Sequence, residues 1–94
     1  MVLEVALFDV RPGAEQAFAQ AYAQARPLLA QSEGCRSVRM TQGVETPTRF
    51  VLLVEWDSLD AHELFRASPR FGEWRALVAP HFATPPLVEH YQDL

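Results

Sequence analysis

The sequence predicts an α+β fold in which strands and helical regions follow one another in the order βαββαβ. Four segments are rich in β-branched and large apolar residues and are bounded by turn residues. Two segments between them carry apolar residues at helical spacings of three and four. The chain has 94 residues, of which 49% are hydrophobic, so we expect one domain over residues 1–94.

The first strand is predicted over Val2–Val10, because Arg11-Pro12-Gly13 then supplies turn residues. The clearest periodicity in the chain follows and predicts one amphipathic helix. Its apolar stripe consists of Ala14, Ala17, Phe18, Ala21, Tyr22, Ala25, Leu28 and Leu29. Pro27 removes a helical hydrogen bond, so we expect a kink there, and Gly34 is a stop signal.

The middle of the chain predicts a hairpin of two strands, Cys35–Gln42 and Arg49–Asp57, joined by Gly43–Thr48. A charge within an apolar strand needs a partner, so we expect Arg39 and Glu55 to pair across this hairpin.

Two short helices and a last strand complete the chain. Ser58 is a predicted N-cap for a helix over Leu59–Ala67, and Ser68-Pro69 starts a second helix that Pro80 ends. Leu87–Tyr91 is the last predicted strand. Two βαβ crossovers joined by a hairpin give the ferredoxin-like arrangement, a four-stranded antiparallel sheet with helices on one face.

Both faces of the predicted sheet are apolar, although the helices cover only one of them. In the first strand Val2, Ala6, Phe8 and Val10 alternate with Leu3, Val5 and Leu7, and in the third Phe50, Leu52, Val54 and Trp56 alternate with Val51 and Leu53. Each large apolar side chain left in water forfeits about 1.5–3 kcal/mol of burial. We therefore expect a homodimer in which a second copy covers the helix-free sheet face.

Charge and hydropathy exclude several classes of partner. The net charge is −4 and no run of basic residues exists, so neither nucleic acid nor an anionic membrane surface is an expected partner. No apolar stretch approaches the roughly 20 residues of a membrane helix, and the N-terminus lacks the basic region of a signal peptide. A cytoplasmic location is the expectation. Cys35, the only cysteine, is expected to be a buried structural thiol.

Several motifs, taken with this order of elements, resemble the antibiotic biosynthesis monooxygenase family. They are V-E-W-D-S-L-D-A-H at Val54–His62, R-P-G-A-E at Arg11–Glu15, E-G-C at Glu33–Cys35 and F-R-A-S-P-R-F at Phe65–Phe71. The similarity covers almost the whole chain, and W-x-S-x-x-A-H is its most specific part. It implies a dimeric α+β barrel with a pocket between sheet and helices. It also implies cofactor-independent oxidation of quinols or polycyclic phenols, haem degradation, or processing of small signalling molecules.

The resemblance does not extend to the residues of the haem-degrading members. Those members carry Asn, Trp and His at positions that align with Ala6, Phe65 and Arg75, so haem degradation is not expected here. Members that act on quinols often carry a His-Phe pair where this sequence has Arg70-Phe71.

His62 is the first candidate for a catalytic residue. Leu59 and Phe65, three residues to either side, are expected to face the core, which would point His62 at the pocket. A neutral imidazole there would deprotonate a phenol or hydroquinone, and the resulting anion would reduce oxygen without flavin or metal. A hydrogen-bonded, half-buried structural histidine fits the same spacing.

Aromatic residues supply the predicted wall for a flat substrate, although core packing is the alternative for each ring. The candidates are Trp56, Phe65, Phe71, Trp74 and Phe82. No histidine pair has metal-ligand spacing on one element, so no metal and no cofactor are expected. Cys35, His81 and His90 have no assigned role.

Three functional hypotheses follow. The first is a cofactor-independent monooxygenase acting on a small aromatic quinol or phenol, with His62 as base. The second is a non-enzymatic dimeric barrel that binds or senses a small hydrophobic ligand, and the third is a structural dimer with a filled pocket. The first two hypotheses are to be discriminated by whether His62 opens onto a solvent-connected cavity or is sealed in a packed core.

Overall fold

The computed structural model describes residues 1–94 and has the predicted order of elements. They are β1 (Val2–Asp9), α1 (Glu15–Ala30), β2 (Cys35–Gln42), β3 (Arg49–Trp56), α2 (Leu59–Arg66), α3 (Pro69–Val78), a 3₁₀ turn η1 (Ala79–His81) and β4 (Leu87–Tyr91). The predicted ferredoxin-like α+β fold is confirmed, and the predicted strand bounds differ from the observed ones only at the ends of β1 and β3. α1 continues through Pro27 to Ala30.

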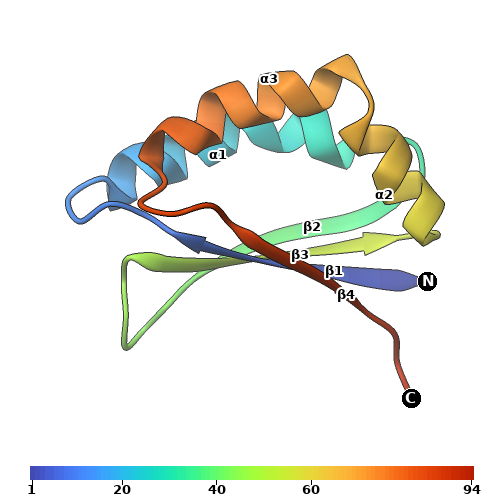
Figure 1. Ribbon diagram of the computed structural model, residues 1–94, viewed down its shortest axis with the longest axis horizontal. Helices are drawn as coiled ribbons and strands as arrows, with labels where there is room; N and C mark the ends of the chain where they lie inside the picture. The colour runs from blue at the N-terminus through green and yellow to red at the C-terminus, as the bar shows by residue number, and fades with distance from the viewer.

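The four strands form one antiparallel sheet in the order β2-β3-β1-β4. β1 lies in the centre, where Val2 pairs with Trp56 of β3 and Glu4 pairs with His90 of β4. The three helices lie on one side of the sheet, and no element covers the other side (Figure 1). This arrangement places the core and any internal cavity between the sheet and the helices.

The core forms where inward side chains of the two central strands meet the helices. Ala6, Phe8, Leu52 and Val54 alternate with half-buried residues along β1 and β3, because successive strand residues point to opposite faces. Phe18 of α1, which is fully buried, packs against Phe8 and Phe50 at centroid distances of 5.9 and 4.7 Å.

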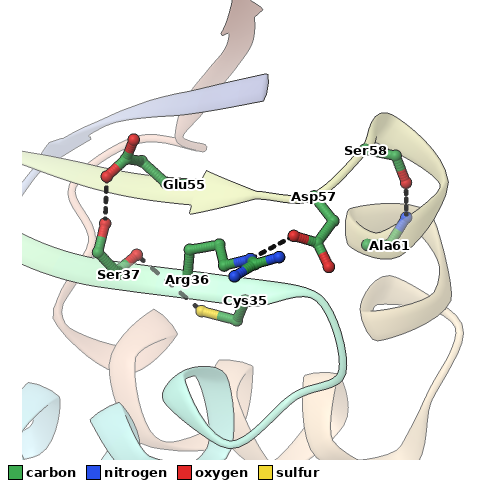
Figure 2. A network of polar contacts seen from close by, with 7 residues as sticks. All are labelled: Cys35, Arg36, Ser37, Glu55, Asp57, Ser58 and Ala61. Atoms are coloured by element: carbon green, nitrogen blue, oxygen red, sulfur yellow. Dashed lines mark hydrogen bonds and ion pairs between the residues drawn. The ribbon is translucent and has the colours of Figure 1, made fainter. Parts of the chain in front are cut away.

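The predicted Arg39–Glu55 pair is wrong, because the hairpin register does not bring these residues together. Arg39 pairs with Leu53, and a register shift between Cys35 and Ser37 brings Ser37 opposite Glu55. The Ser37 hydroxyl donates a hydrogen bond of 2.8 Å to the Glu55 carboxylate (Figure 2). Leu59 also departs from expectation, because this residue is 45% exposed rather than buried in the core.

Local contacts at the ends of β2 and β3 fix where α2 begins. The Ser58 hydroxyl accepts a hydrogen bond of 3.2 Å from the backbone N–H of Ala61, and Arg36 forms an ion pair with Asp57 (Figure 2). Gly34 has a φ of +83° and lies so close to Ala61 that a β-carbon added to Gly34 would lie 2.6 Å from the β-carbon of Ala61. These contacts set the position of α2, and with it the position of His62.

The helix-free face of the sheet carries Leu3, Val5 and Leu7 of β1 and Val51 and Leu53 of β3, all half-buried in the single chain. Figure 1 shows nothing packed against this face. None of the helices combines the length and the apolar character needed to cross a membrane.

Candidate functional site

A cavity of about 550 Å³ lies between the helix-covered face of the sheet and the helices. β1 contributes Glu4, Ala6 and Phe8 to it, and side chains of α2, α3 and the segment before β4 close its sides. Most of the lining is apolar, and its charged or titratable members are Glu4, His62, Arg66 and Arg75. The cavity therefore suits an apolar ligand that meets a few polar groups at defined points.

Glu4 is the buried carboxyl group of this cavity. Its side chain points to the same face of β1 as those of Ala6 and Phe8, which is the face toward the helices. The residue is only 5% exposed. Its Oε1 accepts a hydrogen bond of 2.9 Å from the indole N–H of Trp56. Oε2 accepts no hydrogen bond from the protein and is not fully buried, and Glu4 is one of the residues that line the cavity. Burial raises the pKa of Glu4, against the opposing effects of Trp56 and Arg66.

His62 lies against this carboxyl group on α2 and is 4% exposed. Its ring stacks on Trp56 at a centroid distance of 5.0 Å and an interplanar angle of 18°. Its Nε2 lies 3.3 Å from Oε1 of Glu4. Burial, followed by the charges of His90 and Arg66, lowers the pKa of His62 to about 4. The imidazole is therefore neutral at pH 7 and can accept a proton.

His90 joins this pair from the edge strand β4. The β1–β4 register sets His90 directly opposite Glu4, and its Nε2 lies 2.7 Å from Nδ1 of His62. His90 is half-buried and also borders a shallow surface depression with Val2 and Tyr91. Three titratable side chains from three elements thus form a continuous line from the cavity to the outer edge of the sheet.

The structure places the predicted site residues in two positions. Phe65, Phe71, Trp74 and Phe82 line the cavity together with His62. Trp56 lies behind His62, is 0% exposed and does not line the cavity.

The other two residues without an assigned role lie elsewhere. His81 packs against the edge of Phe18 at 6.4 Å, and Cys35 is half-buried at the start of β2. The pairing of His62 is therefore with His90 and not with His81.

Sequence reasoning missed Glu4 and His90 as members of the site. A signal for Glu4 was present, because its spacing of two and four residues from Ala6 and Phe8 places a carboxyl group on the helix-covered face. His90 had no such signal, since its partner is 28 residues away on another element. No group of three or more His, Cys, Asp or Glu side chains has the arrangement of a metal site.

Comparisons with known proteins give a consistent result for the whole chain. The family model described as antibiotic biosynthesis monooxygenase matches residues 1–77. The chain is 37% identical over 95 residues to the uncharacterized protein YczJ of Bacillus subtilis (strain 168), with complete coverage of both.

Solved structures extend the comparison to three dimensions. A Bordetella bronchiseptica protein named as a candidate antibiotic biosynthesis monooxygenase is 42% identical, with a TM-score of 0.94, over 99% of this chain and 96% of that one. SnoaB, a cofactor-independent oxygenase from Streptomyces nogalater, is 18% identical with a TM-score of 0.85, over 98% of this chain and 91% of that one. At that identity the likeness to SnoaB concerns the fold alone.

Proposed function

Because this chain belongs to the antibiotic biosynthesis monooxygenase family, we propose that it is a cofactor-independent monooxygenase whose substrate is a small hydroxylated aromatic, a quinol or phenol. The observation that carries the proposal is the buried Glu4–His62 pair at an otherwise apolar cavity of about 550 Å³. A neutral imidazole and a carboxyl group with perturbed pKa values in one cleft are typical of acid–base sites.

The pair supplies the proton acceptor that such a reaction needs. The substrate hydroxyl would donate its proton to the Glu4–His62 pair, in which Oε2 of Glu4 accepts no hydrogen bond from the protein. The substrate anion then passes an electron to dioxygen, which is the oxidant, and a carbon–oxygen bond forms. The O–O bond breaks as water leaves. For a hydroquinone the sum is hydroquinone plus O₂ giving hydroxyquinone plus H₂O, with all four electrons coming from the substrate.

The aromatic lining supports a flat substrate. Phe65 and Phe71 meet edge to face at 5.7 Å, and Trp74 is held edge to face by Tyr22 at 6.3 Å. Rings fixed by such contacts keep their orientation and can stack on a bound aromatic. We propose Phe65, Phe71, Trp74 and Phe82 as the substrate wall. Trp56 contributes indirectly, since it holds both Glu4 and His62 in place.

Oxygen consumption with a panel of hydroquinones and phenols tests this proposal, with the product identified after use of isotopically labelled dioxygen. We expect His62→Ala to lower the rate by at least about a hundredfold, the usual contribution of a positioned acid–base group. His81→Ala is the matched control, because His81 lies outside the cavity. Equal rates for wild type and His62→Ala would remove His62 from the mechanism, and no uptake with any member of the panel would refute the monooxygenase.

A non-enzymatic ligand-binding barrel is the second candidate, and one observation favours it. Both ring nitrogens of His62 already have a polar neighbour, as in a structural histidine: Nδ1 is hydrogen-bonded to His90, and Nε2 lies 3.3 Å from Oε1 of Glu4. This candidate predicts saturable binding of a hydroquinone, followed by calorimetry, without any oxygen uptake.

We further propose that a second copy of this chain covers the helix-free sheet face. The supporting evidence is the half-buried row Leu3, Val5, Leu7, Val51 and Leu53. The resemblance to the family, which implies a dimeric barrel, points the same way. Light scattering should give twice the chain mass of 10.6 kDa. Leu53→Glu should give monomers, whereas Gln16→Glu on the exposed side of α1 should not. A monomeric wild type would contradict the proposal.

A further inference from the structure

We propose that Glu4, His62 and His90 form a proton relay that connects the cavity with the outer surface at β4. The relay deepens the proposed function. It rests on that function only because it takes the substrate hydroxyl as the source of the proton. It assigns His90 the role of outer proton carrier and Glu4 that of the group facing the substrate.

The inner end of the relay is the cavity-facing carboxyl group. Glu4 lines the cavity, its Oε2 accepts no hydrogen bond from the protein, and its Oε1 lies 3.3 Å from Nε2 of His62. The indole N–H of Trp56 holds Oε1 in position, and the Trp56 ring supports the face of His62. Carboxyl group and imidazole are thus kept adjacent by a third side chain that does not titrate.

The middle of the relay is the contact between two imidazoles. Nδ1 of His62 and Nε2 of His90 are 2.7 Å apart, which is a short hydrogen bond, so one ring donates and the other accepts. A neutral imidazole carries one proton on either nitrogen. His62 can therefore take a proton at Nε2 and release one at Nδ1 without moving its ring.

The outer end is open to water. Nδ1 of His90 has no bonded partner in the protein, and no buried side-chain nitrogen lacks one, so this atom is reached by solvent. His90 borders the surface depression formed with Val2, Leu59, Tyr91 and Gln92, outside the cavity. A proton that arrives at His90 can leave to bulk water without passing through the substrate site.

The surrounding charges favour passage of a proton over its storage at His62. Arg66 of α2 and Arg75 of α3 line the same cavity, while β3 contributes the uncharged Leu52 to its lining and the uncharged Trp56 behind His62. A positive His62 would face Arg66 on its own helix and His90 across the hydrogen bond. His62 is therefore suited to conduct a proton between Glu4 and His90.

A reversible relay matches the needs of the proposed reaction. The substrate loses a hydroxyl proton before oxygen reacts, and a proton must return when water leaves. A chain of groups that can shift one proton outward and back satisfies both steps.

Exchange of the His62 ring N–H with water tests the relay without any substrate. NMR of the full-length protein with isotope-labelled histidine should show a scalar coupling between His62 and His90 nitrogens. In His90→Phe, which keeps a ring but no nitrogen, exchange should slow by at least about tenfold. His81→Phe is the control and should exchange at the wild-type rate. In His90→Ala, added imidazole should restore exchange in proportion to its concentration, an effect that a purely structural role would not give.

The outcomes separate the relay from the monooxygenase. Unchanged exchange in His90→Phe with a native amide spectrum, or no effect of imidazole on His90→Ala, would overturn the relay. Slowed exchange together with no oxygen uptake by wild type would uphold the relay and reject the monooxygenase. Where a hydroquinone is turned over, His90→Phe should lower kcat with KM unchanged and enlarge the solvent isotope effect.

Discussion

Replacing His62 by Gln should change how the free energy of unfolding depends on pH. Burial keeps the folded-state pKa of His62 at about 4, whereas the ordinary pKa of a histidine, which applies in the unfolded chain, is 6.5. Between these two values the unfolded chain binds a proton that the folded protein does not. The contribution of His62 to the unfolding free energy therefore falls as the pH drops across this range.

The difference between a pKa of 6.5 and one of about 4 corresponds to about 3 kcal/mol. The stability that wild type has above a pH of 6.5 should fall by that amount as the pH drops to about 4, and then level off. Glu4 acts in the opposite direction, because its raised pKa lets the folded state keep a proton longer as pH rises. Glu4 is present in both proteins, so the difference between wild type and His62→Gln isolates His62.

Urea unfolding at a series of pH values and one fixed protein concentration measures this difference. Gln can donate to Glu4 and accept from His90, so His62→Gln should fold. Its stability relative to wild type should rise by about 3 kcal/mol between neutral pH and a pH near 4. Parallel curves for the two proteins would refute the assignment of a buried, neutral His62.

Three further predictions concern the fold. Gly34→Ala should lower the unfolding free energy by about 1–3 kcal/mol, because Gly34 has a φ of +83° and lies close to Ala61. Gly72→Ala should raise the unfolding free energy by about 0.5–1 kcal/mol, because Gly72 lies on α3 with open space around it. Urea unfolding checks both, and equal changes would contradict the argument. Ser58→Ala should lower the unfolding free energy by about 1 kcal/mol, because the N-cap hydrogen bond is lost. The Tm should fall accordingly, and an unchanged Tm would contradict this prediction. Burial raises the pKa of Cys35, so Ellman's reagent should react with it more slowly than in the urea-unfolded chain.

The order of elements was predictable because its signals are local. Ser58 and Pro69 mark helix starts within one turn of the chain, and alternation along Val2–Val10 identifies a strand without knowledge of its partners. The Arg39–Glu55 pair failed because cross-strand partners depend on the register shift between Cys35 and Ser37, which composition does not reveal.

The site was predictable only in part. Helical spacing placed His62 and Phe65 on one face, and the structure places both at the cavity. The same spacing failed for Leu59, because the first residue of α2 lies beside Tyr91 at the surface depression, at the edge of the sheet. The partners of His62 depend on contacts between residues far apart in sequence, and only the folded chain brings Glu4 and His90 together.

The pairing of β4 with β1 decides whether the relay exists at all. Glu4 and His90 face each other because five residue pairs align these strands, and side chains alternate along each strand. A slip of one residue would turn His90 to the helix-free face and set Glu89 or Tyr91 opposite Glu4. β4 is a short edge strand whose apolar residues Leu87 and Val88 are exposed, so burial alone specifies its register weakly. The hydrogen bond between His62 and His90 therefore also selects the register, and the same contact that would carry the proton helps to hold the last strand in place.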